Sequence, residues 1–241
     1  MLPKLRLLAR RSTFKMNLAS IFTTRGYLIR RALWKEINKF GLSAQGNLLD
    51  FGCGSKPYQS AFLSCNSYIG IDVEITGHDH RNSLVDVFFN GSVIPFNNAH
   101  FDIAIAIEVF EHLSEPSKAI TEIQRVLRPN GLLFLSIPFI YGEHEMPHDF
   151  QRFTLMGLKT LVEENQFQII ELKKLNDNLG TIGQLFIDNF IYKNRYSNHL
   201  IWKAFTTLLI FPANCLIMSM SIFKSKDSQV YSNLICIAKK I

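Results

Sequence analysis

The sequence predicts an α/β protein built on a doubly wound parallel sheet, and three observations support this fold class. Short runs rich in Ile, Val, Leu and Phe recur along the chain, and several are apolar on both faces, as buried parallel strands are. Helical patterns separate these runs, and such alternation is typical of parallel sheets. The chain of 241 residues, 47% of them hydrophobic and 19% charged, is long enough to bury the core of one large domain.

The expected elements alternate from the first strand to a closing segment at 233–241. Pro116 stands where a central helix should start, and Pro129, Asn130 and Gly131 follow its expected end. Proline at the first position and proline and glycine after the last are typical of helix boundaries. Ligands of such a sheet bind at the carboxyl ends of its strands. The predicted strands are 47–53, 68–73, 84–89, 101–109, 131–139, 167–175 and 233–240, and the predicted helices are 57–64, 116–127 and 154–165.

A basic N-terminal arm, residues 1–46, precedes the first strand. Residues 1–39 carry ten Lys or Arg against a single acid, Glu36, which gives +9, whereas the other 202 residues sum to −3. We expect helices here, whose basic face either is solvated while they cap the domain or lies on an anionic membrane or nucleic acid. The first charges precede no apolar stretch long enough for a secretory signal, and the four cysteines lack CxxC spacing. Both observations favour a reducing, cytoplasmic setting.

An insertion, residues 176–232, separates the core, residues 47–175, from the closing strand. Within it, residues 204–223 form a charge-free run of 20 residues, which is long enough to span a bilayer. A proline, an asparagine and four Ser or Thr residues dilute this run, and a crossing would separate the last strand from its sheet. We therefore expect helices that are buried on the domain or rest in a membrane interface.

The first predicted strand runs into the sequence LLDFGCGSKPY. Gly52 and Gly54, with Cys53 between them, let a ligand approach the backbone, and the turn offers free N–H groups. A dinucleotide site would require a third glycine where Pro57 stands, so a pyrophosphate fits less well. Asp50 suits a ligand with a positive group instead. S-adenosylmethionine has an α-ammonium of this kind, and its carboxylate could bind the N–H groups of the turn.

The second predicted strand ends in YIGIDV, which places Asp72 about 20 residues beyond the glycine turn. An acid at this point can accept hydrogen bonds from both ribose hydroxyls of a nucleoside. Alone, Asp72 could equally be a surface acid at a strand end. Together with the turn, it indicates a ligand that carries both a nucleoside and a positive charge.

On these stretches the chain resembles the class I S-adenosylmethionine-dependent methyltransferases, from about Asn47 to Leu175. The resemblance implies a Rossmann-like sheet of seven strands, mostly parallel with an antiparallel last strand, and S-adenosyl-L-methionine as cofactor. It also places Asn90 and Gly91 beside the adenine, where the family usually has an acid. An amide oxygen can still accept a hydrogen bond from the adenine amine. The matching sequences are LLDFGCGS, YIGIDV, NGSVIPFNNAHFDIAIAIEVFEHL and IQRVLRPNGLLFLSIPF.

The fourth predicted strand leads into IEVFEHL, where Glu108, Glu111 and His112 form an ExxEH pattern beside the expected sulfonium. In one interpretation, Glu108 lines the cofactor pocket and the other two residues cap the next helix. In a second interpretation, the three side chains bind Mg²⁺ or Mn²⁺, because the pattern resembles a subset of O-methyltransferases in which ExxEH holds a divalent metal. Such a metal would lower the pKa of a substrate hydroxyl.

A second polar cluster, PFIYGEHEMPHDFQRFT, follows the fifth predicted strand. His144, His148 and Asp149 fall in a loop at the carboxyl edge, where a histidine could take a proton from a hydroxyl nucleophile. With Glu108 they are the candidate catalytic residues. Alternatively, Asp149 and Arg152 only brace the loop by an ion pair. The pattern resembles a bacterial branch of these methyltransferases that is associated with surface-polysaccharide synthesis.

Together these features predict O-methylation of a small or glycan- or lipid-linked acceptor hydroxyl. Peripheral membrane contact through 1–39 and 200–223 would bring the domain to a lipid-linked acceptor. Two alternatives stay open, a non-catalytic methyltransferase-like scaffold and an RNA ribose methyltransferase. Methylation of nucleic-acid bases is disfavoured because EVFEHL stands where an NPPY-like motif is expected, and an NAD-linked enzyme is disfavoured by the missing third glycine.

Overall fold

The computed structural model describes residues 20–24, 26–74, 83–176, 179–195, 200–223 and 229–241. Within them, seven strands form one sheet in the order β3-β2-β1-β4-β5-β7-β6. β7 is antiparallel to both of its neighbours, and β1 to β5 pair in parallel. The predicted fold class, including the antiparallel last strand, is confirmed. The strands are β1 (Gly46–Phe51), β2 (Cys65–Val73), β3 (Val87–Phe89), β4 (Phe101–Ile107), β5 (Leu127–Pro138), β6 (Phe167–Leu175) and β7 (Asn233–Lys240).

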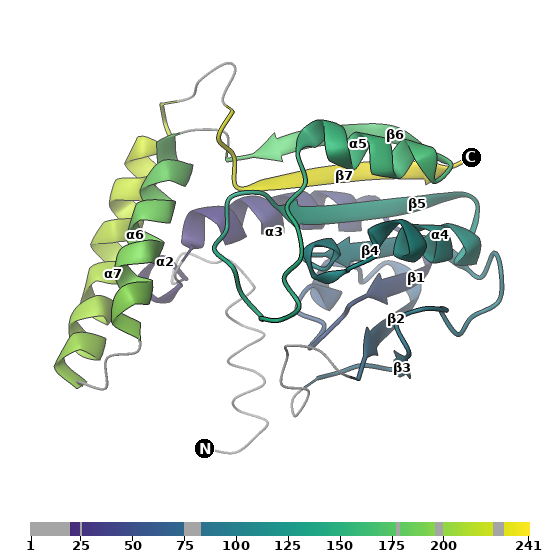
Figure 1. The fold of residues 1–241 in the computed structure, drawn as a ribbon, viewed down its shortest axis with the longest axis horizontal. Helices are drawn as coiled ribbons and strands as arrows, with labels where there is room; N and C mark the ends of the chain where they lie inside the picture. The colour runs from purple at the N-terminus through teal and green to yellow at the C-terminus, as the bar shows by residue number, and fades with distance from the viewer. Residues whose placement is uncertain (1–19, 25, 75–82, 177–178, 196–199, 224–228) are drawn as a thin grey trace.

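Helices cover both faces of the sheet and give a three-layered core (Figure 1). α3 (Tyr27–Ser43), from the basic arm, packs on one face, where Ile37 joins a buried cluster with Phe134 of β5. α4 (Pro116–Val126) and α5 (Leu155–Glu164) pack on the other face. Much of the described arm is therefore a covering helix of the core, held there by burial of its apolar side chains.

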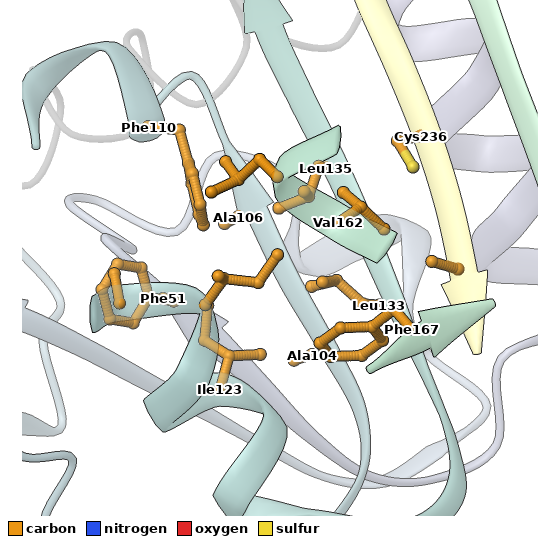
Figure 2. Packing of buried hydrophobic residues seen from close by; sticks show 14 of the residues in the cluster. Phe51, Ala104, Ala106, Phe110, Ile123, Leu133, Leu135, Val162, Phe167 and Cys236 are labelled. Atoms are coloured by element: carbon orange, nitrogen blue, oxygen red, sulfur yellow. The ribbon is translucent and has the colours of Figure 1, made fainter. Parts of the chain in front are cut away.

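The central strand β4 shows how one sequence serves both layers. Ile103 and Ile105 belong to the cluster under α3, whereas Ala104 and Ala106 belong to the cluster under α4 and α5. Successive side chains of a strand point to opposite faces, so the alternation of large and small residues assigns each to one layer. Figure 2 shows the second cluster, in which the two alanines lie among larger side chains such as Ile123 of α4.

The helix predicted at 57–64 is absent, and a single 3₁₀ turn, η1 (Gln59–Ala61), stands in its place. β2 begins at Cys65, three residues before its predicted start. The chain between the glycine turn and β2 is consequently too short for a helix of several turns. The predicted helix is therefore wrong, and the segment between the glycine turn and β2 contains only a 3₁₀ turn.

Two strand boundaries also differ from the prediction. The strand expected at 84–89 is limited to three residues of β3, and β5 starts at Leu127, directly after α4. The expected turn at Pro129 to Gly131 therefore lies within β5, where Asn130 has a positive φ of 65°. The pairing of β4 with β5 shifts in register at this point, which accommodates the irregular backbone.

The insertion contains α6 (Leu179–Arg195) and α7 (Leu200–Met220), which pack against each other beside one end of the sheet (Figure 1). α7 also contacts the short α2 (Ser20–Thr23). The side-chain amide of Asn214 donates to the carbonyl oxygens of Ile21 at 2.7 Å and Thr24 at 3.1 Å. The arm and the insertion, far apart in sequence, are therefore joined.

The charge-free run on α7 has a buried and an exposed side. Ile210 and Ile217 are buried, whereas Leu208 and Leu216 are exposed over 76% and 57% of their surfaces. Among the described helices, none combines the length and the hydropathy needed to cross a membrane. The structure thus supports partial burial of this segment on the domain and leaves an apolar face of α7 exposed.

Candidate active site

The predicted site residues gather at the carboxyl edge of the parallel strands. Asp50, near the end of β1, stands beside Gly70 of β2 and Ile105 of β4 in register. β5 ends at Pro138, opposite the start of β7 at Asn233. The loop after β5 and the insertion before β7 therefore leave the sheet at this same edge (Figure 1).

The glycine turn has one crowded position and one open position. Gly52 and Gly54 both have positive φ, 71° and 48°. A Cβ atom on Gly52 would lie 2.6 Å from a methyl carbon of Val109, so this position requires glycine for space as well as for conformation. A Cβ atom on Gly54 would meet no atom of the described residues within 4 Å. The backbone at Gly54 therefore has an open side that a ligand can approach.

The N–H groups of this turn are bonded within the protein. Gly52 and Cys53 both donate to the carbonyl oxygen of Ile71, at 2.9 and 3.0 Å. Gly54 donates to a carboxylate oxygen of Asp72 at 2.9 Å. A carboxylate of the cofactor would therefore have to compete for these three donors or bind others, and its contact with the turn stays a prediction. The bonds of these three N–H groups tie the glycine turn to the end of β2.

Asp72 is placed for the role that its position in the sequence predicts. It is largely buried at the end of β2, and its other oxygen accepts from the backbone N–H of Val73 at 2.9 Å. A carboxylate offers about four acceptor sites. With two of these used by backbone N–H groups, Asp72 keeps acceptor capacity for ribose hydroxyls while its orientation is fixed.

Asp50 belongs to a buried polar network beneath the glycine turn. Its carboxylate accepts from the Tyr68 hydroxyl at 2.5 Å. Burial raises the pKa of Asp50 to about 7, while the Tyr68 hydrogen bond and the charge of Lys56 act in the opposite direction. Lys56, itself buried, forms an ion pair with Asp86, which also accepts from the Gly70 N–H at 2.7 Å. A ligand ammonium beside Asp50 would stabilise its charged form.

Sequence reasoning missed Tyr68, Lys56 and Asp86. Asp86 lies within the third predicted strand, and Lys56 lies in the turn, so neither stands in a motif position that marks it as functional. The close alignment of β1 and β2 could have indicated Tyr68, which pairs in register with Leu48, two residues before Asp50. Residues two apart on a strand share a face, and this brings the Tyr68 hydroxyl within reach.

Cys53 and Asn90 have structural contacts in the predicted cofactor crevice. Burial is the main cause that raises the pKa of the Cys53 thiol, which stays protonated at neutral pH. The side-chain oxygen of Asn90 accepts from the backbone N–H groups of Ser92 at 3.0 Å and Val93 at 3.2 Å. This oxygen shapes the turn that contains Gly91, so it is less free to accept from an adenine amine than the sequence suggested.

Glu108 is held at the end of β4 by one side chain from the adjacent strand β5 and one from β7, the strand beyond it. One carboxylate oxygen accepts from the Ser136 hydroxyl at 2.6 Å, and the amide of Asn233 donates to both oxygens at 3.0 and 3.1 Å. Glu108 has a positive φ of 56°, an unfavourable conformation for a residue with a long side chain. Burial raises the pKa of its carboxyl group. These contacts fix Glu108 beside the expected sulfonium.

The ExxEH turn and the histidine-rich loop form one unit. The backbone N–H of Phe150 donates to the carbonyl oxygen of Glu111 at 2.9 Å, and the Gln151 amide donates to that of Leu113 at 2.7 Å. The ring Nδ1 of His112 lies 2.7 Å from the carbonyl oxygen of His148. A carbonyl only accepts, so this nitrogen carries the proton and Nε2 keeps its lone pair.

Asp149 positions His144. Its carboxylate, 1% exposed, accepts from the backbone N–H of His144 at 2.9 Å and lies 3.3 Å from Nδ1 of the ring. Arg152 binds the same carboxylate at 2.5 and 2.8 Å and is the main reason why the pKa of Asp149 falls to about 2. The bracing interaction expected from the sequence therefore exists. It coexists with a second role, because the brace holds the imidazole.

Glu111 and His112 lie next to this pair. The Glu111 side chain is 0% exposed. Burial raises its pKa to about 9, with a further contribution from the charge of Glu108, so it is protonated at neutral pH. Burial also lowers the pKa of His112. Glu111, His112 and His144 form a group with metal-ligand spacing, and Glu108 is not part of it. Two of the three predicted metal ligands, Glu111 and His112, thus lie together, and His144 takes the place that the prediction gave to Glu108.

Comparisons with known proteins decide the family. A family described as "Methyltransferase domain" matches residues 25–180, which is more than half of the chain. The chain belongs to this family. It is an S-adenosylmethionine-dependent methyltransferase, with S-adenosyl-L-methionine as methyl donor. The methyltransferase is 29% identical over 176 residues to the O-methyltransferase rstn1 of Aspergillus nomiae, covering 61% of this chain and 76% of the relative. It spans about half the length of several other relatives.

Solved structures share the fold of this methyltransferase. The [4+2]-cyclase SpnF superposes with a TM-score of 0.57 at 21% identity, covering 88% of this chain and 81% of that protein. Phosphoethanolamine N-methyltransferase 2 of Haemonchus contortus, in complex with S-adenosyl-L-methionine, gives a TM-score of 0.57 at 11% identity. That match covers 96% of this chain and 60% of the other. At these identities the likeness concerns the fold alone, so the acceptor must be argued from the site.

Alanine at the two glycines should separate stability from cofactor binding. Both substitutions place a methyl group on a left-handed backbone, which costs about 1–2 kcal/mol at each position. Only at Gly52 does the new methyl group also collide with Val109. We expect Gly52→Ala to reduce the free energy of unfolding distinctly more than Gly54→Ala, and Gly54→Ala to weaken cofactor binding in a folded protein. Urea unfolding and calorimetry with S-adenosylhomocysteine measure both effects, and equal destabilisation by the two variants would contradict the assignment.

Cofactor affinity should depend on pH through Asp50. Because the pKa of this carboxyl is about 7 and a bound ammonium favours the ionised form, binding below pH 7 must displace a proton. Affinity for S-adenosylhomocysteine should rise by up to about tenfold per pH unit below 7 and level off above it. Calorimetry from pH 5.5 to 8.5 measures this slope. Asp50→Asn should bind more weakly with a flatter profile, and a profile identical to that of the wild type would count against Asp50.

Proposed function

We propose that this methyltransferase transfers its methyl group to an oxygen atom, the hydroxyl of a small or glycan- or lipid-linked acceptor. One observation carries the proposal, which is the convergence of Glu111, His112, His144 and Asp149 into one group beside Glu108, here named the His–carboxylate cluster. A hydroxyl must lose its proton when it attacks a methyl group, and groups of this kind promote that loss. The relative whose name specifies an O-methyltransferase supports the same acceptor atom.

The cofactor lies across the glycine turn in this proposal, with its ammonium near Asp50 and its ribose at Asp72. The adenine lies near Asn90 and Gly91, and the methyl group points past Glu108 toward the His–carboxylate cluster. The acceptor oxygen forms a bond to the methyl carbon while the carbon–sulfur bond breaks, and its electron pair stays on sulfur. S-adenosylhomocysteine leaves, and the hydroxyl proton departs through the cluster. Alignment of the three reacting atoms supplies much of the acceleration.

The apolar face of the insertion supports an acceptor that is presented at a membrane. α6 and α7 emerge at the same edge as the cluster, and Phe186, Leu208 and Leu216 are exposed on them. The excess of Lys and Arg in residues 1–39 would add attraction to an anionic surface. Peripheral contact of this kind would deliver a lipid-linked hydroxyl to the site. Flotation with anionic liposomes tests the contact, and a protein that stays at the bottom of the gradient rejects it.

A labelled-methyl assay tests the proposed function. The protein is incubated with S-adenosylmethionine carrying a tritiated methyl group and with a cell extract separated into lipid, RNA and soluble glycan or small-molecule fractions. We expect label in the lipid or soluble fraction, in a product that resists mild base as a methyl ether does. Label in RNA would favour ribose methylation instead. A protein that binds the cofactor and labels nothing would be the non-catalytic scaffold.

Asp149→Asn should lower turnover without abolishing cofactor binding. The substitution keeps the shape of the side chain but removes the charge that orients His144, so we expect kcat to fall by about 10²–10⁴-fold. The melting temperature reports whether the loop still folds without the full Arg152 ion pair. Glu143→Gln, an exposed acid in the same loop, is the matched control and should keep wild-type activity. Unchanged kcat in Asp149→Asn would remove the cluster from the mechanism.

A further inference from the structure

We propose that Glu111, His112 and His144 bind a divalent transition-metal ion, with Mn²⁺ as the preferred probe. Each side chain offers one ligand atom, and these atoms all lie within 4.8 Å of one another. Glu111 and His112 come from the turn after β4, whereas His144 comes from the loop after β5. The hydrogen bonds that join these two segments therefore assemble the three ligands.

The Glu111 carboxyl group is buried without a partner among the described residues. It is 0% exposed, and within the described part of the chain neither of its oxygens has a hydrogen-bond partner. Burying a polar group without a partner reduces stability, and such groups are rare in folded proteins. A cation in contact with these oxygens would supply the missing interaction. The group faces the two imidazoles, so the cation would lie between them.

Both imidazole rings are held through Nδ1. His112 Nδ1 is bonded to the carbonyl oxygen of His148, and His144 Nδ1 lies 3.3 Å from the Asp149 carboxylate and 3.2 Å from the carbonyl oxygen of Gly142. All of these partners are acceptors, so each Nδ1 carries a proton and each Nε2 presents a lone pair. Metal-binding histidines are typically held in this way, by a carbonyl or a carboxylate on the second nitrogen.

The side chains lie close to the separation that a shared metal ion requires. His112 Nε2 lies 3.7 Å from a carboxyl oxygen of Glu111, and a carboxylate oxygen of Glu145 lies at the same distance on another side. Two ligands on a tetrahedral metal with bonds of about 2.1 Å are roughly 3.4 Å apart. The separation between Glu111 and His112 exceeds this value slightly, and the three ligand atoms all lie within 4.8 Å of one another, so the side chains would move inward to coordinate an ion.

The donor set indicates which metal would bind. Two imidazoles and one carboxylate suit Mn²⁺, Zn²⁺ and related transition metals better than Mg²⁺ or Ca²⁺, which prefer oxygen ligands. Three protein ligands leave coordination positions open, as in catalytic metal sites. Glu108 is excluded from the set because Ser136 and Asn233 occupy its carboxylate.

The role of this site rests on the proposed function. An acceptor hydroxyl that occupies an open position on the ion would have a lower pKa. Because the two imidazoles would then be engaged as ligands, the proton would be released to solvent water and not taken up by the cluster. The oxygen would then attack the methyl carbon, and the electron pair of the broken carbon–sulfur bond would return to sulfur. The ion would also hold the oxygen in line with the cofactor, which is the larger requirement of methyl transfer.

Metal binding can be measured without any acceptor. The untagged protein, treated with EDTA and dialysed, is titrated with Mn²⁺ while the electron paramagnetic resonance signal of the free ion is recorded. We expect one Mn²⁺ per chain, and at least about tenfold weaker binding in Glu111→Gln, His112→Ala and His144→Ala. Glu143→Gln, an exposed acid in the same loop, is the matched control and should bind as the wild type does.

The outcomes separate this inference from the proposed function. No binding of Mn²⁺, or binding that the three ligand substitutions leave unchanged, would overturn the metal site. If Glu111→Gln fails to fold, His144→Ala decides, because its side chain comes from a surface loop. Methyl transfer to a hydroxyl that proceeds at the same rate with and without EDTA would support the proposed function and contradict a role for the metal ion in it. Binding of Mn²⁺ by a protein that methylates no hydroxyl would support the metal site and contradict the proposed function.

Discussion

The hydrogen bond from the Gly54 N–H to the Asp72 carboxylate is the contact on which the rest of the site depends. It joins the end of β1 to the end of β2 at 2.9 Å and fixes both the glycine turn and the acid that should receive the ribose. A bond from a backbone N–H to a carboxylate is stronger than a neutral one, and burial protects this one from water. The parallel pairing of β1 with β2 and β4 then sets the positions of Asp50 and Glu108 around the same crevice.

Around that contact, the sheet edge concentrates carboxyl groups whose pKa values are raised by burial. The pKa of Asp50 is raised to about 7 and that of Glu111 to about 9, and the pKa of Glu108 is raised as well. Holding such groups away from water reduces stability, and sites that do so are typically functional. A cationic cofactor on one side of Glu108 and a metal ion on the other would each convert this cost into binding energy. The two proposals therefore draw on one electrostatic feature of the fold.

The sequence is a good guide to the sheet and a partial guide to the site. Apolar runs fix the strands because burial on both faces leaves a continuous pattern, and DFGCG and IDV mark Asp50 and Asp72 because strand ends of this fold meet at one edge. Tyr68 and Lys56 could not be predicted, because their contacts depend on side-chain direction across neighbouring elements. The proximity of Glu111 to His144 could not be predicted either, because it arises only when the loop after β5 folds back onto the turn after β4. The prediction of a helix at 57–64 was wrong because the room for a helix depends on where β2 begins, and β2 begins three residues earlier than predicted.

Calorimetric titration of S-adenosylhomocysteine into wild type, Asp72→Asn and Glu74→Gln tests the central claim most directly. Glu74 is an exposed acid two residues beyond Asp72, so its variant controls for a general loss of negative charge. We predict that wild type and Glu74→Gln bind equally, and that Asp72→Asn binds about ten- to hundredfold more weakly, as expected for loss of a hydrogen bond to a charged group. Equal affinity in all three proteins, or no binding by the wild type, would contradict the cofactor crevice described above.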